Sequence, residues 1–78
     1  MSMIPEVKIG DSSNVVLSYQ YIMHYKLGFD KQPCNGHFDA RMQYNVKYYQ
    51  DEHDLPVTGI INEKTGYSMI VETGYEEP

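Results

Sequence analysis

Cys34 and His37, separated by two residues, are the pair in this chain that could begin a metal site or a nucleophilic centre. A structural zinc ion needs four ligands at close quarters, and the sequence offers neither a second cysteine nor two histidines at helical spacing to complete the set. A catalytic cysteine needs an oriented base and an oxyanion-stabilising element, and the sequence shows neither. We therefore predict no metal, no cofactor and no enzymatic activity.

Three carboxylates cluster near the end of a predicted helix, at Asp51, Glu52 and Asp54. Negative charge at a helix C-terminus opposes the helix dipole, and nothing nearby suggests the tuned environment of a general acid–base pair. We interpret these carboxylates as facing water or a cation that a partner supplies.

Tyrosine is unusually frequent, with eight tyrosines and no tryptophan. Four of them lie off the core-facing positions of the predicted helices and form two pairs with a spacing of four, which makes the members of each pair neighbours on a helix surface. A tyrosine ring offers a flat apolar face for a sugar and a hydroxyl for hydrogen bonding. These four are candidate ligand contacts, with packing across a thin core as the open alternative: Tyr21, Tyr25, Tyr44 and Tyr48.

Gln20 and Gln50 each follow a tyrosine at a core position, Tyr19 and Tyr49. Their amide groups could contact the peptide part of a ligand, or they could satisfy the backbone of a facing turn. Both remain candidate ligand residues, although we favour the structural role.

The composition is that of one small folded domain, with 78 residues, 41% hydrophobic and 22% charged. A net charge of −5 argues against nucleic-acid binding, which depends on clustered Lys and Arg. No segment approaches the ~20 apolar residues of a membrane helix, so we expect no membrane insertion. The opening residues MSMIPEV lack the basic start and apolar run of a secretory signal.

Apolar residues recur at steps of three and four over residues 12–27, which predicts a first helix that Gly28 stops in a left-handed conformation. Asp39 is expected to cap a second helix that ends near Glu52, and Asn62 a third one. We expect residues 1–8 to form an N-terminal extension, residues 9–71 the domain, and residues 72–78 a frayed acidic tail.

The entries to the second and third helices are alike, since NGHFDARMQY (35–44) is echoed by TGIINEKTGY (58–67). Each has a glycine that permits positive φ, an apolar residue for the core and a polar cap. The two sets are Gly36, Phe38 and Asp39, and Gly59, Ile61 and Asn62. Repeat arrays generally need about three units or more, so we interpret the two copies as a pseudo-repeat inside one domain. Together with the three predicted helices, this indicates an all-α fold, a compact three-helix bundle with two similar turn-plus-helix entrances.

These residues resemble the peptidoglycan-binding domain family, an accessory module of cell-wall hydrolases and phage endolysins. The family pattern places a Leu-Gln pair on the first helix, a Phe-Gln pair on the second, and an Asp-Gly turn before the second and third helices. The matching positions, within residues 9–70, are Val16, Tyr19-Gln20, Met23, Asn35-Gly36-His37-Phe38, Val46, Tyr49-Gln50, Leu55, Thr58-Gly59-Ile60-Ile61 and Thr65.

The chain departs from the family pattern at several positions. Asn35 and Thr58 replace the turn aspartates, but both keep a side-chain oxygen that can bond turn amides, so we expect the turns to survive. The first helix is one residue longer before Gly28. The other replacements are Asp39 and Asn62 for glycine, Met42 for threonine and Asn45 for alanine.

The resemblance implies a non-catalytic cell-wall binding module that targets a linked hydrolase or a phage structure to peptidoglycan, through the glycan or the peptide stem. It also implies a location at the bacterial cell wall, outside the cell or on a phage. The alternative is a protein–protein interaction or assembly module with a tyrosine-rich docking face.

Overall fold

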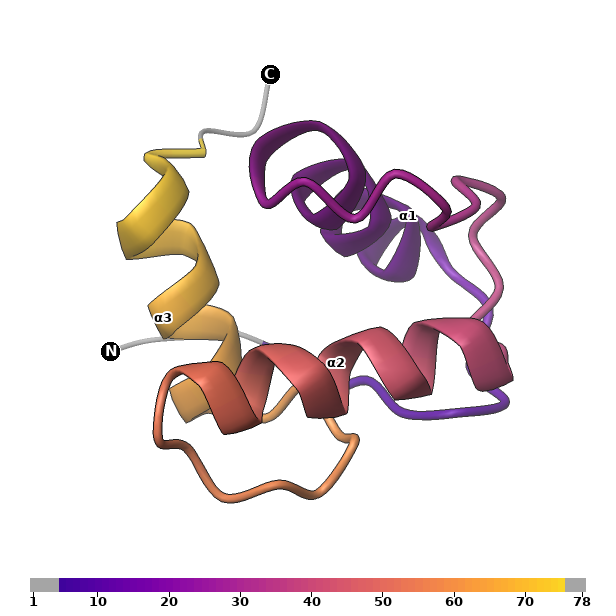
Figure 1. Cartoon of the computed structure of the whole chain (residues 1–78). Coiled ribbons are helices and arrows are strands. Elements are labelled where there is room, and N and C mark those ends of the chain that lie inside the picture. Colours follow the sequence, from indigo (N-terminus) through magenta and orange to yellow (C-terminus); the bar gives the residue numbers. More distant parts are fainter. Residues whose placement is uncertain (1–4, 76–78) are drawn as a thin grey trace.

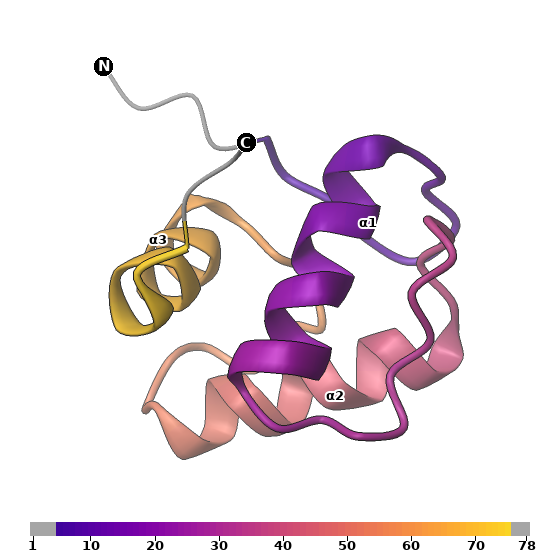
Figure 2. The ribbon, with the colours of Figure 1, turned by 90° about the horizontal axis from the view of Figure 1, so that it is seen from above.

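The computed structural model describes residues 5–75. Within this range the chain forms helices α1 (Asn14–Tyr21), α2 (Ala40–Glu52) and α3 (Glu63–Thr73), and the π-helical turn η1 (Ile22–Lys26) continues α1. The three α-helices enclose a common interior (Figure 1), and α1 crosses over α2 with α3 beside them (Figure 2). The prediction of an all-α three-helix bundle is confirmed.

Each helix begins where a side chain can cap its first turn. Ser13 Oγ accepts a hydrogen bond from the N–H of Val16 at 3.1 Å. The predicted caps are confirmed, because Asp39 Oδ1 accepts from Met42 and Asn62 Oδ1 accepts from Thr65, both at 2.9 Å. Such bonds satisfy backbone donors that the helix itself leaves unpaired.

The extra residue of the first helix is accommodated by η1. The N–H of Leu27 donates to the carbonyl of Ile22 at 3.0 Å, which is a span of five residues instead of four. A π turn therefore holds one residue more than an α turn. Gly28 follows with φ +84°, so the predicted left-handed stop is confirmed.

The core combines residues from all helices and both entrances. Phe38 and Ile61 are buried as predicted, and so are Tyr19 and Tyr49. The remaining buried hydrophobic residues are Val7, Val16, Ile22, Met23, Met42, Val46 and Met69.

The N-terminal segment differs from the expected extension. Val7 is only 5% exposed and pairs with Ile61 in an isolated antiparallel bridge, with N–O distances of 3.1 and 2.9 Å. Further along, the N–H of Phe38 donates to the carbonyl of Asp11 at 2.8 Å. The packed chain therefore starts before Ile9, because this segment is tied to both helix entrances; residues 1–4 lie outside the described range.

The C-terminal boundary also differs. Helix α3 continues through Glu72 and Thr73, and Gly74 ends it with φ +67°. Glu72 is bonded to α2, so it is not part of a frayed tail. The rest of the expected tail, residues 76–78, lies outside the described residues. In the described part of the chain, no helix has the length and apolar content needed to cross a bilayer.

Candidate functional site

Gln20, near the end of α1, holds the first turn. Its Oε1 accepts hydrogen bonds from the N–H groups of Asn35 (3.0 Å) and Gly36 (2.7 Å), and its Nε2 donates to the carbonyl of His37 (2.8 Å). Gly36 has φ +83°, a conformation that a side chain would strain. One buried amide thus organises the whole turn.

Gln50, near the end of α2, does the same at the second turn. Its Oε1 accepts from Thr58 and Gly59, both at 2.9 Å, and its Nε2 donates to the carbonyl of Ile60 at 3.0 Å. Like Gln20, it has no exposed surface. The two glutamines therefore make the turn-holding hydrogen bonds of the structural role that we favoured, and both side chains are buried.

The side chains that replace the turn aspartates keep the expected bonds. Asn35 Oδ1 accepts from the N–H of His37 at 2.9 Å, and Thr58 Oγ1 accepts from the N–H of Ile60 at 3.1 Å. A side-chain oxygen two residues before the donor is what these turns require.

An open groove, here called the aromatic groove, lies where the segment after η1 crosses α2. It has a volume of 410 Å³ and is lined by Leu27, Gly28, Phe29, Tyr44, Asn45 and Tyr48. Tyr44 is 63% exposed and Tyr48 is 54% exposed. Because they are four residues apart, they are neighbours on one face of α2. Two of the four candidate tyrosines therefore line one concave surface.

Packing around this groove fixes its walls. The ring of Phe29 meets the ring of Tyr48 edge to face, with centroids 6.1 Å apart and planes at 90°. Beneath the rings, Asn45 Nδ2 donates to Gln32 Oε1 at 2.9 Å, and both side chains are buried. This bond joins the connector after η1 to α2. Separating the two would leave buried amide groups without partners, which costs free energy.

A second hollow continues the aromatic groove toward the C-terminal end of α2; we call it the acidic pocket. It measures 190 Å³ and is lined by Leu27, Phe29, Tyr48, Tyr49, Glu52, His53 and Glu72. Both hollows are lined by Leu27, Phe29 and Tyr48, so they adjoin along α2, and we refer to the two together as the depression.

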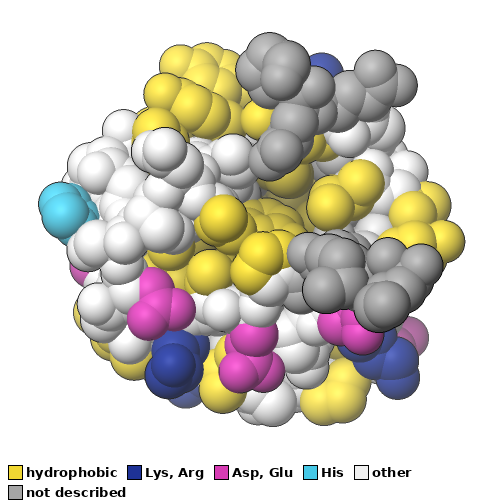
Figure 3. Space-filling model, turned by 180° about the vertical axis from the view of Figure 1, so that it is seen from behind, with side chains coloured by type: hydrophobic (Ala, Val, Ile, Leu, Met, Phe, Trp, Pro, Cys, Tyr) yellow, Lys and Arg dark blue, Asp and Glu magenta, His cyan; other side chains and the backbone are white. Residues whose placement is uncertain are grey.

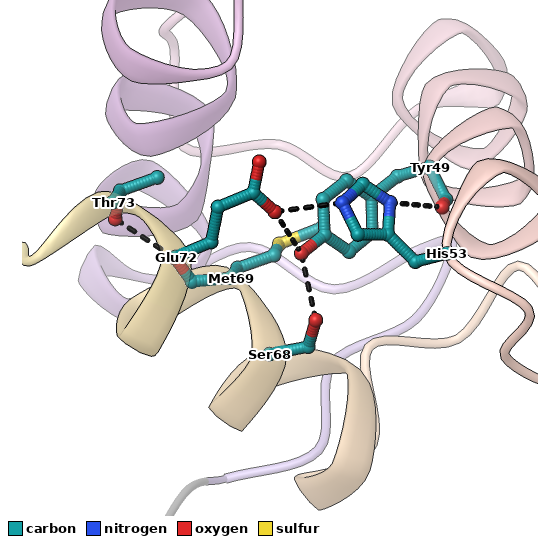
Figure 4. A network of polar contacts seen from close by, with 6 residues as sticks. All are labelled: Tyr49, His53, Ser68, Met69, Glu72 and Thr73. Carbon is teal, nitrogen blue, oxygen red and sulfur yellow. Dashed lines mark hydrogen bonds and ion pairs between the residues drawn. The ribbon is translucent and has the colours of Figure 1, made fainter.

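Side chains from α2 and α3 meet at the acidic pocket (Figure 4). His53 stacks on Tyr49 with ring centroids 3.9 Å apart. Its Nε2 lies 2.7 Å from Glu72 Oε1, and its Nδ1 lies 2.9 Å from the carbonyl oxygen of Tyr49. Both ring nitrogens of His53 are therefore held by oxygen atoms, one of them on α3.

The hydroxyl of Tyr49 completes this network. It donates to Glu72 Oε1 at 2.9 Å and lies 2.8 Å from Ser68 Oγ. The pKa of Tyr49 is raised to about 12, mainly because the side chain is buried; the hydrogen bond with Ser68 acts to lower it, and the carboxylate of Glu72 also acts to raise it. Tyr49 therefore stays neutral and links the two helices.

The other two candidate tyrosines lie elsewhere. Tyr21 on α1 and Tyr25 on η1 are 6.2 Å apart at their ring centroids and line neither hollow. Tyr67 and Val71 form another exposed pair, on α3. Hydrophobic side chains also gather in the centre of the face opposite to that of Figure 1 (Figure 3). Exposed apolar surface is thus not confined to the aromatic groove.

Cys34 and His37 have separate partners, and within residues 5–75 no hydrogen bond joins their side chains. His37 Nδ1 lies 2.6 Å from Ser12 Oγ, and burial raises the pKa of the Cys34 thiol. Within residues 5–75, no group of three or more His, Cys, Asp or Glu side chains could hold a metal ion.

The sequence singled out Tyr44 and Tyr48 but not the other residues that line the two hollows. Phe29, Asn45 and Glu72 contribute to the depression from other positions in the chain. Phe29 directly follows Gly28, the glycine that stops the first helix. This position next to the helix stop is the one sequence signal that could have indicated that Phe29 lines the groove.

Comparisons with known proteins agree with this fold. Residues 24–69 match the model of a family described as "Putative peptidoglycan binding domain". Among solved structures, the SleB N-terminal domain superposes with a TM-score of 0.83 at 23% identity, covering 94% of this chain and 99% of that one. No curated protein matches the chain.

Proposed function

The chain belongs to the peptidoglycan-binding domain family, and from this premise we propose that it is a non-catalytic module that holds the bacterial cell wall in its aromatic groove. The observation that carries this assignment is the pair Tyr44 and Tyr48, which stay exposed while lining a concave surface. Large rings left in water at this position are available for a ligand.

The chemistry of the aromatic groove suits a glycan. The apolar face of a tyrosine ring packs against the C–H groups of a sugar, and the hydroxyl exchanges hydrogen bonds with sugar hydroxyls or peptide amides. The edge-to-face contact with Phe29 limits the rotamers of Tyr48, so less conformational entropy is lost on binding.

The binding role needs no reactive group. The rings and the groove supply contacts, and the partly buried thiol of Cys34 lies outside the groove lining. A weak site of this kind is useful when it is tethered, because linkage to a hydrolase or a phage structure raises the effective concentration of that partner at the wall. The module would then act at the bacterial cell wall or elsewhere outside the cell.

Co-sedimentation with purified, protein-free peptidoglycan tests the proposal. The native chain is expected to sediment with the wall, and the double variant Tyr44→Ala/Tyr48→Ala to lose roughly tenfold in affinity, since two aromatic contacts are removed. Tyr67→Ala is the matched control, because Tyr67 is 61% exposed but lines neither hollow.

Two results would count against the proposal. The first is no retention of the native chain at any salt concentration. The second is equal loss in the Tyr67→Ala control, which would favour the alternative of a protein-docking module that uses the exposed Tyr67 and Val71 on α3.

A further inference from the structure

The depression along α2 is lined by aromatic side chains at one end and by carboxylates at the other. Its aromatic groove presents Tyr44 and Tyr48, and its acidic pocket presents Glu52 from α2 and Glu72 from α3, with His53 held against Glu72. Residues 44, 48 and 52 follow one another on one helix face and cover a rise of about 12 Å. A ligand that fills the depression therefore meets aromatic rings first and carboxylates next.

The negative charge of the Glu52 carboxylate forms no ion pair within residues 5–75. Glu52 is the last residue of α2, where the helix dipole disfavours negative charge. The ion pair found among residues 5–75 joins His53 to Glu72, and no hydrogen bond to the Glu52 side chain occurs in the same range. A cation bound in the acidic pocket would relieve this unfavourable placement.

Glu72 is half used. Both of its contacts, from the Tyr49 hydroxyl and from His53 Nε2, go to Oε1. Its side chain is 45% exposed, and its second carboxylate oxygen points away from both partners (Figure 4). Oε2 is thus oriented for an additional donor while Oε1 holds the helices together.

On the basis of the proposed function, we propose that the acidic pocket receives the free side-chain amine of the diamino acid in a peptidoglycan stem. The tyrosines then hold the sugar or the apolar part of the same stem. A primary ammonium offers three donors and a positive charge, which complements Glu52 and the outer oxygen of Glu72. The module would prefer wall whose stems carry an unsubstituted amine, since cross-linking converts that amine to a neutral amide.

Chemical acetylation of the wall tests this assignment. Purified peptidoglycan is treated with acetic anhydride, which converts free amines to amides, and binding of the native chain to treated and untreated wall is compared by co-sedimentation. We expect acetylation to weaken binding about threefold, the size of a solvent-exposed ion pair. Glu52→Gln should weaken binding to untreated wall by a similar factor and should not respond to acetylation.

Glu63→Gln serves as the charge-matched control, because Glu63 is exposed at the start of α3 and lines neither hollow. It should respond to acetylation as the native chain does. Equal binding to treated and untreated wall, or equal effects of Glu52→Gln and Glu63→Gln, overturns the amine site. The cell-wall function itself stands in that case if Tyr44→Ala/Tyr48→Ala still loses affinity, whereas failure of the native chain to bind untreated wall overturns both proposals.

Discussion

At the scale of single residues, the two buried glutamines supply the hydrogen bonds that regular secondary structure would otherwise provide to the backbone of the two turns. Gln50 satisfies the N–H groups of Thr58 and Gly59 and the carbonyl of Ile60 with one side chain. The Leu-Gln and Phe-Gln pairs of the family pattern thus have a physical reason in this chain. A turn without regular hydrogen bonds still needs partners for its buried backbone groups.

Replacing Gln50 by alanine should therefore be costly. The Gln50→Ala variant leaves the N–H groups of Thr58 and Gly59 without an acceptor, and we expect its free energy of unfolding to fall by about 1–3 kcal/mol or more. Denaturant unfolding monitored by circular dichroism measures the change. Gln43→Ala is the control on the same helix, since the partly buried Gln43 packs against Gly59 but, within residues 5–75, makes no side-chain hydrogen bond to the turn; equal destabilisation by both would contradict this role.

At the scale of elements, most of the helices could be predicted from the sequence because their signals are local. Apolar spacing fixed the buried faces, and Asp39 and Asn62 marked the helix starts. The π turn at the end of the first helix could be located only as an extra residue before Gly28, since its geometry depends on how that residue packs against the rest of the fold.

The bridge between Val7 and Ile61 escaped prediction for a related reason. Its partners are far apart in the sequence, and a single bridge leaves no periodic pattern to detect. The same limit applies to the site: the tyrosines of α2 could be found from their spacing, but Phe29 and Glu72 reach them only through tertiary packing.

The contribution of the N-terminal segment can be measured with a pair of valines. Val7→Ala should lower the free energy of unfolding by about 2 kcal/mol, because it removes two methyl groups from a buried position. Val57→Ala removes the same groups from a side chain that is 52% exposed, and its effect should stay within about 0.5 kcal/mol. Thermal unfolding of both variants provides the comparison, and equal effects would show that Val7 is not part of the core.

At the scale of the whole molecule, the network of Tyr49, His53 and Glu72 joins α2 to α3 and forms the acidic pocket at the same time. The depression that we propose as the binding site and the contact between these helices therefore share residues. If a ligand binds as proposed, the residues that contact it at this end of the molecule also stabilise the fold, whereas the rings of Tyr44 and Tyr48 are largely exposed.

This coupling predicts an alkaline loss of stability. Tyr49 ionises at a pKa of about 12 in the folded protein and near 10 when unfolded. Below pH 10 both states keep the proton; between the two values the unfolded state binds fewer protons, so the free energy of unfolding falls as pH rises. Spectrophotometric titration should show a tyrosinate step near pH 12 that Tyr49→Phe lacks. An unchanged titration curve in that variant would contradict the assignment.

The most direct measurement for the central claim is a nitrogen–proton NMR titration of the native chain with a soluble peptidoglycan fragment. We predict that the largest shift changes fall on the amides of Phe29, Tyr44, Asn45 and Tyr48, while that of Tyr67 stays in place. Largest changes around Tyr67 and Val71 on α3, or no change anywhere at saturating fragment, would contradict binding in the aromatic groove.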